Sequence, residues 1–265
     1  MPPTITLTSD FGTADSYVAE MKGVLLRDGP ADLRVLDLTH ELPPFDIQAA
    51  ALFLRSAVPR FPAGTIHLVV VDPGVGSDRA PLVVKLGEQL LVGPDNRQFG
   101  YLFDGQEEVY IIAADALGKH ELSRTFHGRD LFAPVAARLA GGASPQTLAT
   151  RVDSYQHLVF PMVEFVGDTL VGKVIHIDRF GNLITNIGQA ALLDFLGPFP
   201  HDHAQVALGE RTVRGIVGHY AQGKPGELLA LVGSSGLLEL ALREGHAADK
   251  FVVQVGKHVR VQHGV

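Results

Sequence analysis

Four short polar clusters each begin where a run of β-forming residues ends, which is where ligands gather in α/β sheets. The first, at residues 8–12, contains Asp10; the second, at residues 71–76, contains Asp72 and is followed by Arg79. Asp10 could accept hydrogen bonds from two hydroxyls of a ribose, but it could also cap the next helix. Asp72 and Arg79 could pair within a cleft, or the Asp-Pro-Gly run could simply form a turn.

The other two clusters contain side chains that could handle a proton or a nucleobase. His127 lies in the third cluster, Phe126–Asp130, at the start of a predicted helix, and could act as an acid, a base or an anchor for water. Because the chain has 12 histidines, a structural role is the alternative. Asn182 lies in the fourth cluster, Ile177–Asn182, and its amide both donates and accepts, as reading a nucleobase edge requires. Hairpin turns use the same residue types, so this cluster could also be a turn.

Two further motifs have contexts that argue against a site. The segment Gly218–Pro225 follows the phosphate-loop pattern until Pro225, which stands where a serine or threonine would hold magnesium. His201 and His203 could share a metal only if they lie on a strand, and the neighbouring prolines favour an exposed loop. A metal-dependent hydrolase that uses these histidines is therefore a minor alternative.

Strand and helix patterns alternate in the first half of the chain, and these elements must position the first three clusters. Thr65–Val71 is β-branched almost throughout, which is typical of a parallel strand covered by helices on both faces. Apolar residues at helical spacing predict a helix over Tyr17–Arg27, and Asp46 is expected to cap another. Further strands are expected at Ile5–Thr8, Arg34–Leu38, Pro81–Leu86, Gln89–Val92 and Glu108–Ala113, with a helix at Arg129–Leu139. We predict a layered α/β domain over residues 1–165 with a mostly parallel central sheet.

The second half of the chain contains closely spaced short β runs, and only Gln189–Phe195 has a helical pattern. This pattern predicts a smaller antiparallel β domain over residues 166–265. The expected strands are Leu170–Ile177, Ala204–Leu208, Thr212–Val217, Leu228–Val232, Leu237–Leu242 and Lys250–Val255.

Composition limits the class of protein. The 265 residues are 46% hydrophobic and 19% charged, which suits a globular protein with a sizeable core. The formal net charge of −7 disfavours nucleic acid as a partner. Without cysteine there are no disulfides or thiolate metal sites. No signal peptide and no apolar stretch near the ~20 residues of a membrane span is visible, so we expect a cytoplasmic protein with no membrane partner.

Seven segments in order along the chain resemble the adenosine-forming S-adenosylmethionine hydrolases, a family related to fluorinase and chlorinase. They are Leu7–Gly23, Asp37–Asp46, Val71–Arg79, Val92–Phe99, Phe126–Pro134, Ile177–Ile187 and Val232–Ala248. The resemblance implies that water or hydroxide attacks the ribose C5′ of S-adenosyl-L-methionine and releases adenosine and L-methionine. It places the catalytic triad on Asp72, Arg79 and His127. In the halogenating relatives other residues occupy the Asp and His positions, which favours water over halide here.

The resemblance also implies how the substrate is bound. Asp10 would bind the ribose, Asp15 and Asp178 the methionine part, and Asn182 the adenine edge, while Phe45 would pack beside the substrate. The other expected substrate-binding residues are Ser234, Ser235, Arg243, His246, Ala247 and Ala248. The segment Arg243–Ala248 would contact adenine through its backbone, although His246 stands where the family usually has asparagine.

The family is trimeric, and each site lies between the first domain of one subunit and the second domain of its neighbour. The resemblance therefore implies a homotrimer without a cofactor or a metal. Two alternatives to the hydrolase remain open from the sequence. One is a non-catalytic protein that binds adenosine or S-adenosylmethionine, and the other is an S-adenosylmethionine-dependent halogenase.

Overall fold

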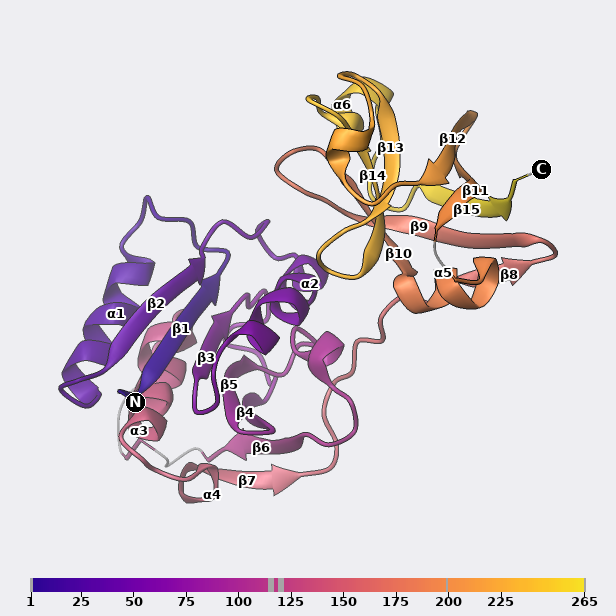
Figure 1. Ribbon diagram of the computed structural model, residues 1–265. Coiled ribbons are helices and arrows are strands. Elements are labelled where there is room, and N and C mark those ends of the chain that lie inside the picture. The colour runs from indigo at the N-terminus through magenta and orange to yellow at the C-terminus, as the bar shows by residue number, and fades with distance from the viewer. Residues whose placement is uncertain (1, 114–116, 119–121, 199, 265) are drawn as a thin grey trace. The chain divides into compact units, whose positions relative to one another are not determined.

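The chain divides into two compact units, Met1–Val159 and Phe160–Val265 (Figure 1). The computed structural model describes residues 2–113, 117–118, 122–198 and 200–264. Within these ranges, no helix is long and apolar enough to cross a membrane.

Unit 1 is built on a seven-stranded mixed sheet with the strand order β2-β1-β3-β5-β4-β6-β7. The strands are β1 (Thr4–Ser9), β2 (Arg34–Thr39), β3 (Ile66–Val70), β4 (Pro81–Leu86), β5 (Gln89–Pro94), β6 (Glu108–Ile112) and β7 (Ala149–Val152). The pairings β1–β2, β1–β3 and β3–β5 are parallel. The pairings of β4 with β5 and β6, and of β6 with β7, are antiparallel.

The expectation of a mostly parallel sheet is therefore correct only for the half that contains β2, β1, β3 and β5. The reason lies in the connection between β4 and β5, where only Gly87 and Glu88 separate the strands. Gly87 has a φ of 57°, a left-handed conformation that suits a tight two-residue hairpin. A hairpin reverses the chain direction, so β4 runs antiparallel to β5, and β6 and β7 continue this alternation.

Helices cover both faces of this sheet (Figure 1). The helices are α1 (Tyr17–Asp28), α2 (Ile47–Ala57), α3 (Ala133–Ala140) and α4 (Pro145–Leu148), with 3₁₀ turns η1 (Val58–Arg60) and η2 (Gly100–Leu102) and a π-helical turn η3 (Gly128–Phe132). On β3, Leu68 joins the core formed with α1 and α3, whereas Val69 joins the core formed with α2. Both faces of β3 are buried, as its sequence predicts. Asp46 caps α2, and its side chain accepts from the Ala49 backbone at 2.9 Å.

Unit 2 is an eight-stranded sheet in which every pairing of named strands is antiparallel, as expected. Its strand order is β12-β11-β15-β9-β10-β14-β13, with β8 added beside β9. The strands are β8 (Glu164–Val166), β9 (Thr169–Ile177), β10 (Leu183–Gly188), β11 (His201–Leu208), β12 (Arg211–Ile216), β13 (Leu228–Val232), β14 (Leu237–Leu242) and β15 (His258–His263). The helical segments are α5 (Gln189–Leu196), η4 (Tyr220–Gln222) and α6 (Ala247–Phe251).

Two expectations about unit 2 are wrong. The predicted strand Lys250–Val255 is instead the end of α6 followed by a turn, because Val252 adopts a left-handed φ of 52° and stops the helix. The predicted exposed loop at His201–His203 is the start of β11, where His201 is buried while His203 is exposed. The two imidazoles therefore differ in their access to solvent, and the structure gives no support to a shared metal.

Candidate active site

Two of the polar clusters begin at the same edge of the unit 1 sheet. β1 and β3 are parallel neighbours, and Ser9 lies opposite Val70, so the segments that begin with Asp10 and Val71 leave the sheet side by side. β2 and β3 flank β1, so the chain moves to opposite sides of β1 in successive crossovers. This arrangement makes the carboxyl end of β1 and β3 a topological switch point, where open α/β sheets bind ligands.

Arg79 joins the acid of one loop to the histidine of another. Its Nε donates to Asp72 Oδ1 at 2.8 Å, and its Nη2 donates to Asp72 Oδ2. The same Nη2 lies 2.9 Å from His127 Nδ1, and the guanidinium carbon lies 5.2 Å from the centre of the Phe132 ring. The side chains of Arg79 and Asp72 are only 6% and 5% exposed. A buried bidentate pair of this kind holds its geometry tightly.

The contact with Arg79 determines which nitrogen of His127 carries the proton. A guanidinium has donors and no acceptor, so Nδ1 must accept and the proton of the neutral ring must lie on Nε2. Burial lowers the pKa of His127, and the positive charge of Arg79 lowers it further. The imidazole is therefore neutral at pH 7 and presents an Nε2–H donor.

Asn96 and Gln98 hold the backbone that carries Asp72, and sequence reasoning missed them as site residues. Asn96 Nδ2 donates to the Val71 carbonyl at 2.7 Å, and Gln98 Nε2 donates to the Val69 carbonyl at 3.2 Å. Gln98 Oε1 also accepts from the Val71 amide at 3.4 Å. The ladder between β3 and β5 ends at Leu68, so these side chains replace the strand partner that the end of β3 lacks. We name this pair of amide side chains the β3 clamp.

The β3 clamp requires an unusual backbone between its two members. Arg97 has a φ of 80°, which is uncommon for a residue with a Cβ, and its side chain is exposed. The signal in the sequence is a polar Asn-Arg-Gln run directly after a buried strand, within a segment that carries the family resemblance.

Asp10 contacts the loop that carries Phe45. The Phe45 amide donates to Asp10 Oδ2 at 2.8 Å, while Phe45 adopts a φ of 67° and its side chain is 70% exposed. One carboxylate oxygen thus fixes an aromatic residue of positive φ at the surface. Asp15, in contrast, lies exposed in the loop before α1, and its side chain has no hydrogen bond or ion pair to any residue that the structure describes.

A second network beneath Asp10 was also missed from the sequence. Ser9 Oγ lies 2.7 Å from His40 Nδ1, and His40 Nε2 lies 3.1 Å from Asp37 Oδ1. Lys22 Nζ lies 2.5 Å from the other oxygen of Asp37. Ser9 is only 1% exposed, so it cannot reach a substrate as a nucleophile, and this network instead ties the ends of β1 and β2 together.

In unit 2, Asp178 organises the turn between β9 and β10. Its Oδ1 accepts from the amides of Phe180 and Asn182 at 2.9 and 2.8 Å, and its Oδ2 accepts from Asn182 Nδ2 at 2.9 Å. The amide nitrogen of Asn182 is therefore engaged by Asp178, which leaves its side-chain carbonyl for another partner. Both predicted residues belong to one compact turn.

The start of α6 packs against this turn. The Ala248 amide donates to the Gly181 carbonyl at 3.1 Å, and the His246 ring lies so close to Gly181 that a Cβ there would overlap it. His246 Nδ1 accepts from the Asp249 amide at 3.2 Å and so caps the helix, as an asparagine in its place could do. The predicted adenine-binding segment and the Asp178 turn therefore lie together.

The remaining predicted residues lie at the two ends of β14, with the serines before its start and Arg243 after its end. Ser234 and Ser235 form the turn between β13 and β14, with Ser234 exposed. Arg243 Nη1 donates to the carbonyls of Ala221 and Gly223, so its guanidinium holds the η4 loop.

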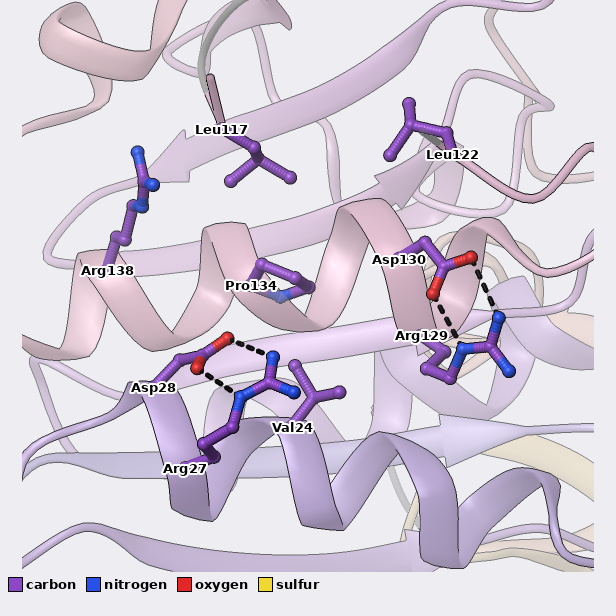
Figure 2. A pocket seen from close by; sticks show the side chains of 9 residues that line it. All are labelled: Val24, Arg27, Asp28, Leu117, Leu122, Arg129, Asp130, Pro134 and Arg138. Carbon is purple, nitrogen blue, oxygen red and sulfur yellow. Dashed lines mark hydrogen bonds and ion pairs between the residues drawn. The ribbon is translucent and has the colours of Figure 1, made fainter. Parts of the chain in front are cut away.

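A cavity of about 670 Å³ in unit 1 does not include the triad (Figure 2). It is lined by Val24, Arg27, Asp28, Leu117, Leu122, Arg129, Asp130, Pro134 and Arg138. Arg27 pairs with Asp28, and Arg129 pairs with Asp130, as Figure 2 shows. These internal pairs balance four of the five charged side chains that line the cavity, and Arg138 is the fifth. Over the described parts of the chain, no group of three His, Cys, Asp or Glu side chains could hold a metal ion.

The fold and the Asp–Arg–His cluster define a two-unit α/β protein with a candidate small-molecule site at the strand ends. The chain belongs to the SAM hydroxide adenosyltransferase family: residues 5–149 match the model of its N-terminal domain, and residues 172–260 match that of its C-terminal domain.

Named relatives agree with this family. The chain is 40% identical to a (R)-S-adenosyl-L-methionine hydrolase from Salinispora tropica over 99% of its own length and 98% of the relative. It is 38% identical to one from Thermus thermophilus, over 96% of the chain and 97% of the relative. A fluorinase from Nocardia brasiliensis is more distant, at 25% identity over 99% of the chain and 97% of the relative. An uncharacterized conserved protein from Thermotoga maritima has a similar structure, with a TM-score of 0.88 and 33% identity over 98% of this chain and 100% of that one.

Proposed function

We propose that this protein hydrolyses S-adenosyl-L-methionine to adenosine and L-methionine. Relatives that are 38–40% identical over nearly the whole chain bear the hydrolase name, whereas fluorinase is at 25%. The single observation that carries the proposal is the contact of Arg79 with both Asp72 and His127. This cluster suits the handling of a water molecule, and it differs from a halide site in its carboxylate.

The difficult part of the proposed reaction is the activation of water as the nucleophile. The substrate is a sulfonium, so attack at C5′ expels a neutral thioether that needs no general acid. Water is a very weak acid, so hydroxide is scarce at neutral pH. Arg79 stabilises developing negative charge on the attacking oxygen. Holding this oxygen in line with the C5′–S bond contributes as well, since good positioning is worth about 7–11 kcal/mol.

We assign the proton to Asp72. Each carboxylate oxygen retains a lone pair after it accepts from Arg79, so Asp72 can accept a hydrogen bond from water and then its proton. His127 presents Nε2–H in its neutral tautomer, so it donates to the water oxygen and orients it. The two residues thus have different tasks on one water molecule.

The remaining residues divide by the part of the substrate that they bind. In this proposal Asp10 binds the ribose hydroxyls, Phe45 packs beside the nucleoside, and Asp15 and Asp178 bind the methionine part. Asn182 and the α6 segment bind adenine, in keeping with the side-chain carbonyl that Asn182 leaves free of Asp178. The complete site is proposed to form in a homotrimer, between unit 1 of one subunit and unit 2 of its neighbour.

The test is chromatography of the products. Purified protein incubated with S-adenosylmethionine in EDTA and chloride should release adenosine and methionine in equal amounts. A main product of 5′-chloroadenosine would replace the hydrolase with a halogenase. Binding of adenosine without turnover would leave only a binding protein. Activity that disappears in EDTA and returns with zinc would require a metal mechanism.

A further inference from the structure

A buried carboxylate in unit 2 has no part in the site described so far. Glu239 lies on β14 and is only 5% exposed. Its neighbours Leu238 and Leu240 point into the main core of unit 2, so Glu239 lies on the opposite face of the sheet. Carboxylates are seldom fully buried in proteins without a charged or hydrogen-bonding partner, because burial removes their hydration.

The partner of Glu239 is neutral. The Tyr220 hydroxyl, from η4, donates to Glu239 Oε1. None of the lysine, arginine and histidine side chains that the structure describes forms an ion pair with Glu239. Burial raises the pKa of the Glu239 carboxyl; the Tyr220 hydrogen bond opposes this shift, and the negative charge of Asp178 adds to it. The negative charges of Glu239 and Asp178 therefore repel each other, and no cationic side chain in the described ranges pairs with Glu239.

The sheet and the β13–β14 turn place Glu239 near three of the proposed substrate-binding residues of unit 2. Glu239 lies opposite Ile184 of β10, which lies opposite His176 of β9, and Asp178 follows two residues after His176. The other oxygen, Oε2, lies so close to Gly233 that a Cβ there would overlap it. Gly233 directly precedes Ser234 and Ser235. Glu239 thus adjoins the serine turn, and it lies near enough to Asp178, across β10, for the two charges to interact.

We propose that Glu239, held by Tyr220, binds the α-ammonium group of the methionine part of the substrate together with Asp178. This inference rests on the proposed function. An ammonium has three N–H donors and can therefore bond to two carboxylates at once, whereas the sulfonium has no N–H donor. The bound ammonium supplies the positive charge that the two carboxylates lack. Glu239 is in this sense a specificity residue for the amino acid part of the substrate.

Two nucleoside probes separate ammonium recognition from nucleoside binding. S-adenosylhomocysteine carries the amino acid but no sulfonium charge, and 5′-methylthioadenosine lacks the amino acid altogether. In calorimetry, Glu239→Gln should bind S-adenosylhomocysteine about 10- to 100-fold more weakly than wild type, as expected for a lost charged hydrogen bond. Binding of 5′-methylthioadenosine should be unchanged. The exposed Glu210→Gln, in the turn between β11 and β12, is the matched control and should change neither.

The outcomes separate this inference from the proposed function. If Glu239→Gln weakened the binding of both probes equally, Glu239 would have only a structural role, and the inference would be wrong. Unchanged binding of S-adenosylhomocysteine would also overturn it. If Glu239→Gln does not fold, Tyr220→Phe replaces it, since Tyr220 is 45% exposed and tolerates the change. That variant should still weaken S-adenosylhomocysteine selectively, and a failure to do so would overturn the inference. A wild-type protein that does not hydrolyse S-adenosylmethionine would overturn the proposed function itself.

Discussion

Arg79 determines the state of both residues that it contacts. It donates to both oxygens of Asp72 from one edge of its guanidinium, through Nε and Nη2, and the same Nη2 fixes the tautomer of His127. A lysine could supply the charge but not this planar geometry. The arrangement therefore separates the two proposed roles on the water molecule, with Asp72 as acceptor and His127 as donor.

Substitutions at Asp72 and Asp10 should separate chemistry from binding. Asp72→Asn should lower turnover by about 10²–10⁴-fold, or ~3–5 kcal/mol of barrier, because the amide cannot take a proton from water. Adenosine binding should remain close to wild type. Asparagine is preferable to alanine, which would leave the buried Arg79 guanidinium without a partner. Single-turnover rates and calorimetry with adenosine measure the two effects.

Asp10→Ala is the complementary variant. It removes the proposed acceptor of two ribose hydroxyls and also frees the Phe45 amide, so adenosine binding should weaken by about 1.5–3 kcal/mol. Normal turnover by Asp72→Asn, or normal adenosine affinity of Asp10→Ala, would show that the roles are assigned wrongly.

The pH dependence should follow His127. Its pKa is lowered from 6.5 by burial and then by Arg79, so the neutral ring persists below pH 6.5. As the pH falls through the lowered pKa, Nδ1 gains a proton, can no longer accept from Arg79, and activity falls. The free energy of unfolding should change in the same direction, because His127 binds a proton more readily in the unfolded chain than in the folded one. The stability that neutral His127 contributes is therefore complete above pH 6.5 and is lost as the pH falls through the lowered pKa.

Profiles of kcat against pH for wild type and His127→Asn test this prediction. The acid limb of the wild type should have an apparent pKa below 6.5 and should be absent from the variant. An acid limb above that value, or one that persists without the imidazole, would assign it to another group.

At the scale of elements, the strands that carry the site were the easiest to predict. Thr65–Val71 is apolar and β-branched over most of its length, and the expected burial on both faces is what β3 has. The β3 clamp was harder to predict, because its contacts depend on where the β5 ladder ends and on a left-handed Arg97. Similarly, the β-forming run at residues 250–255 became the end of a capped helix, since the His246 cap overrides weak strand propensity.

The β3 clamp should affect both stability and turnover. Gln98→Ala removes a fully buried side chain that hydrogen-bonds to the backbone of Val69 and Val71. The free energy of unfolding should therefore fall by about 1–3 kcal/mol. Because the displaced backbone carries Asp72, kcat should fall about tenfold or more while KM stays similar. Arg97→Ala, on the exposed residue between the clamp residues, should change neither. Denaturant unfolding and steady-state kinetics distinguish this outcome from a purely structural one, in which kcat per folded molecule would be unchanged.

At the scale of the whole molecule, the predicted site residues divide between the two units. The residues proposed to hold the water lie in unit 1, and Asp178, Asn182 and the α6 segment lie in unit 2. The sequence could predict this division because the β pattern changes character along the chain. The domain boundary at residues 165/166 stays a prediction.

Assembly should be necessary for activity. If each site forms between subunits, the protein should be a trimer with cyclic symmetry. Light scattering should give a mass three times the 28.4 kDa of the chain, and specific activity should fall on dilution as the trimer dissociates. A monomer that is fully active at nanomolar concentration would contradict a shared site. Mixing Asp72→Asn subunits with Asp178→Asn subunits should restore part of the activity, because some sites would then combine two unaltered halves.

The bond between the Phe45 amide and Asp10 has a thermodynamic consequence. The same carboxylate holds an aromatic residue in a left-handed conformation and is proposed to bind the ribose. Occupancy of the site and the population of this loop conformation are then linked, and linkage is reciprocal. Whatever factor the ordered loop adds to nucleoside affinity, the nucleoside adds to the order of the loop. Residue 45 would thus report on ligand occupancy, although it takes no part in the chemistry.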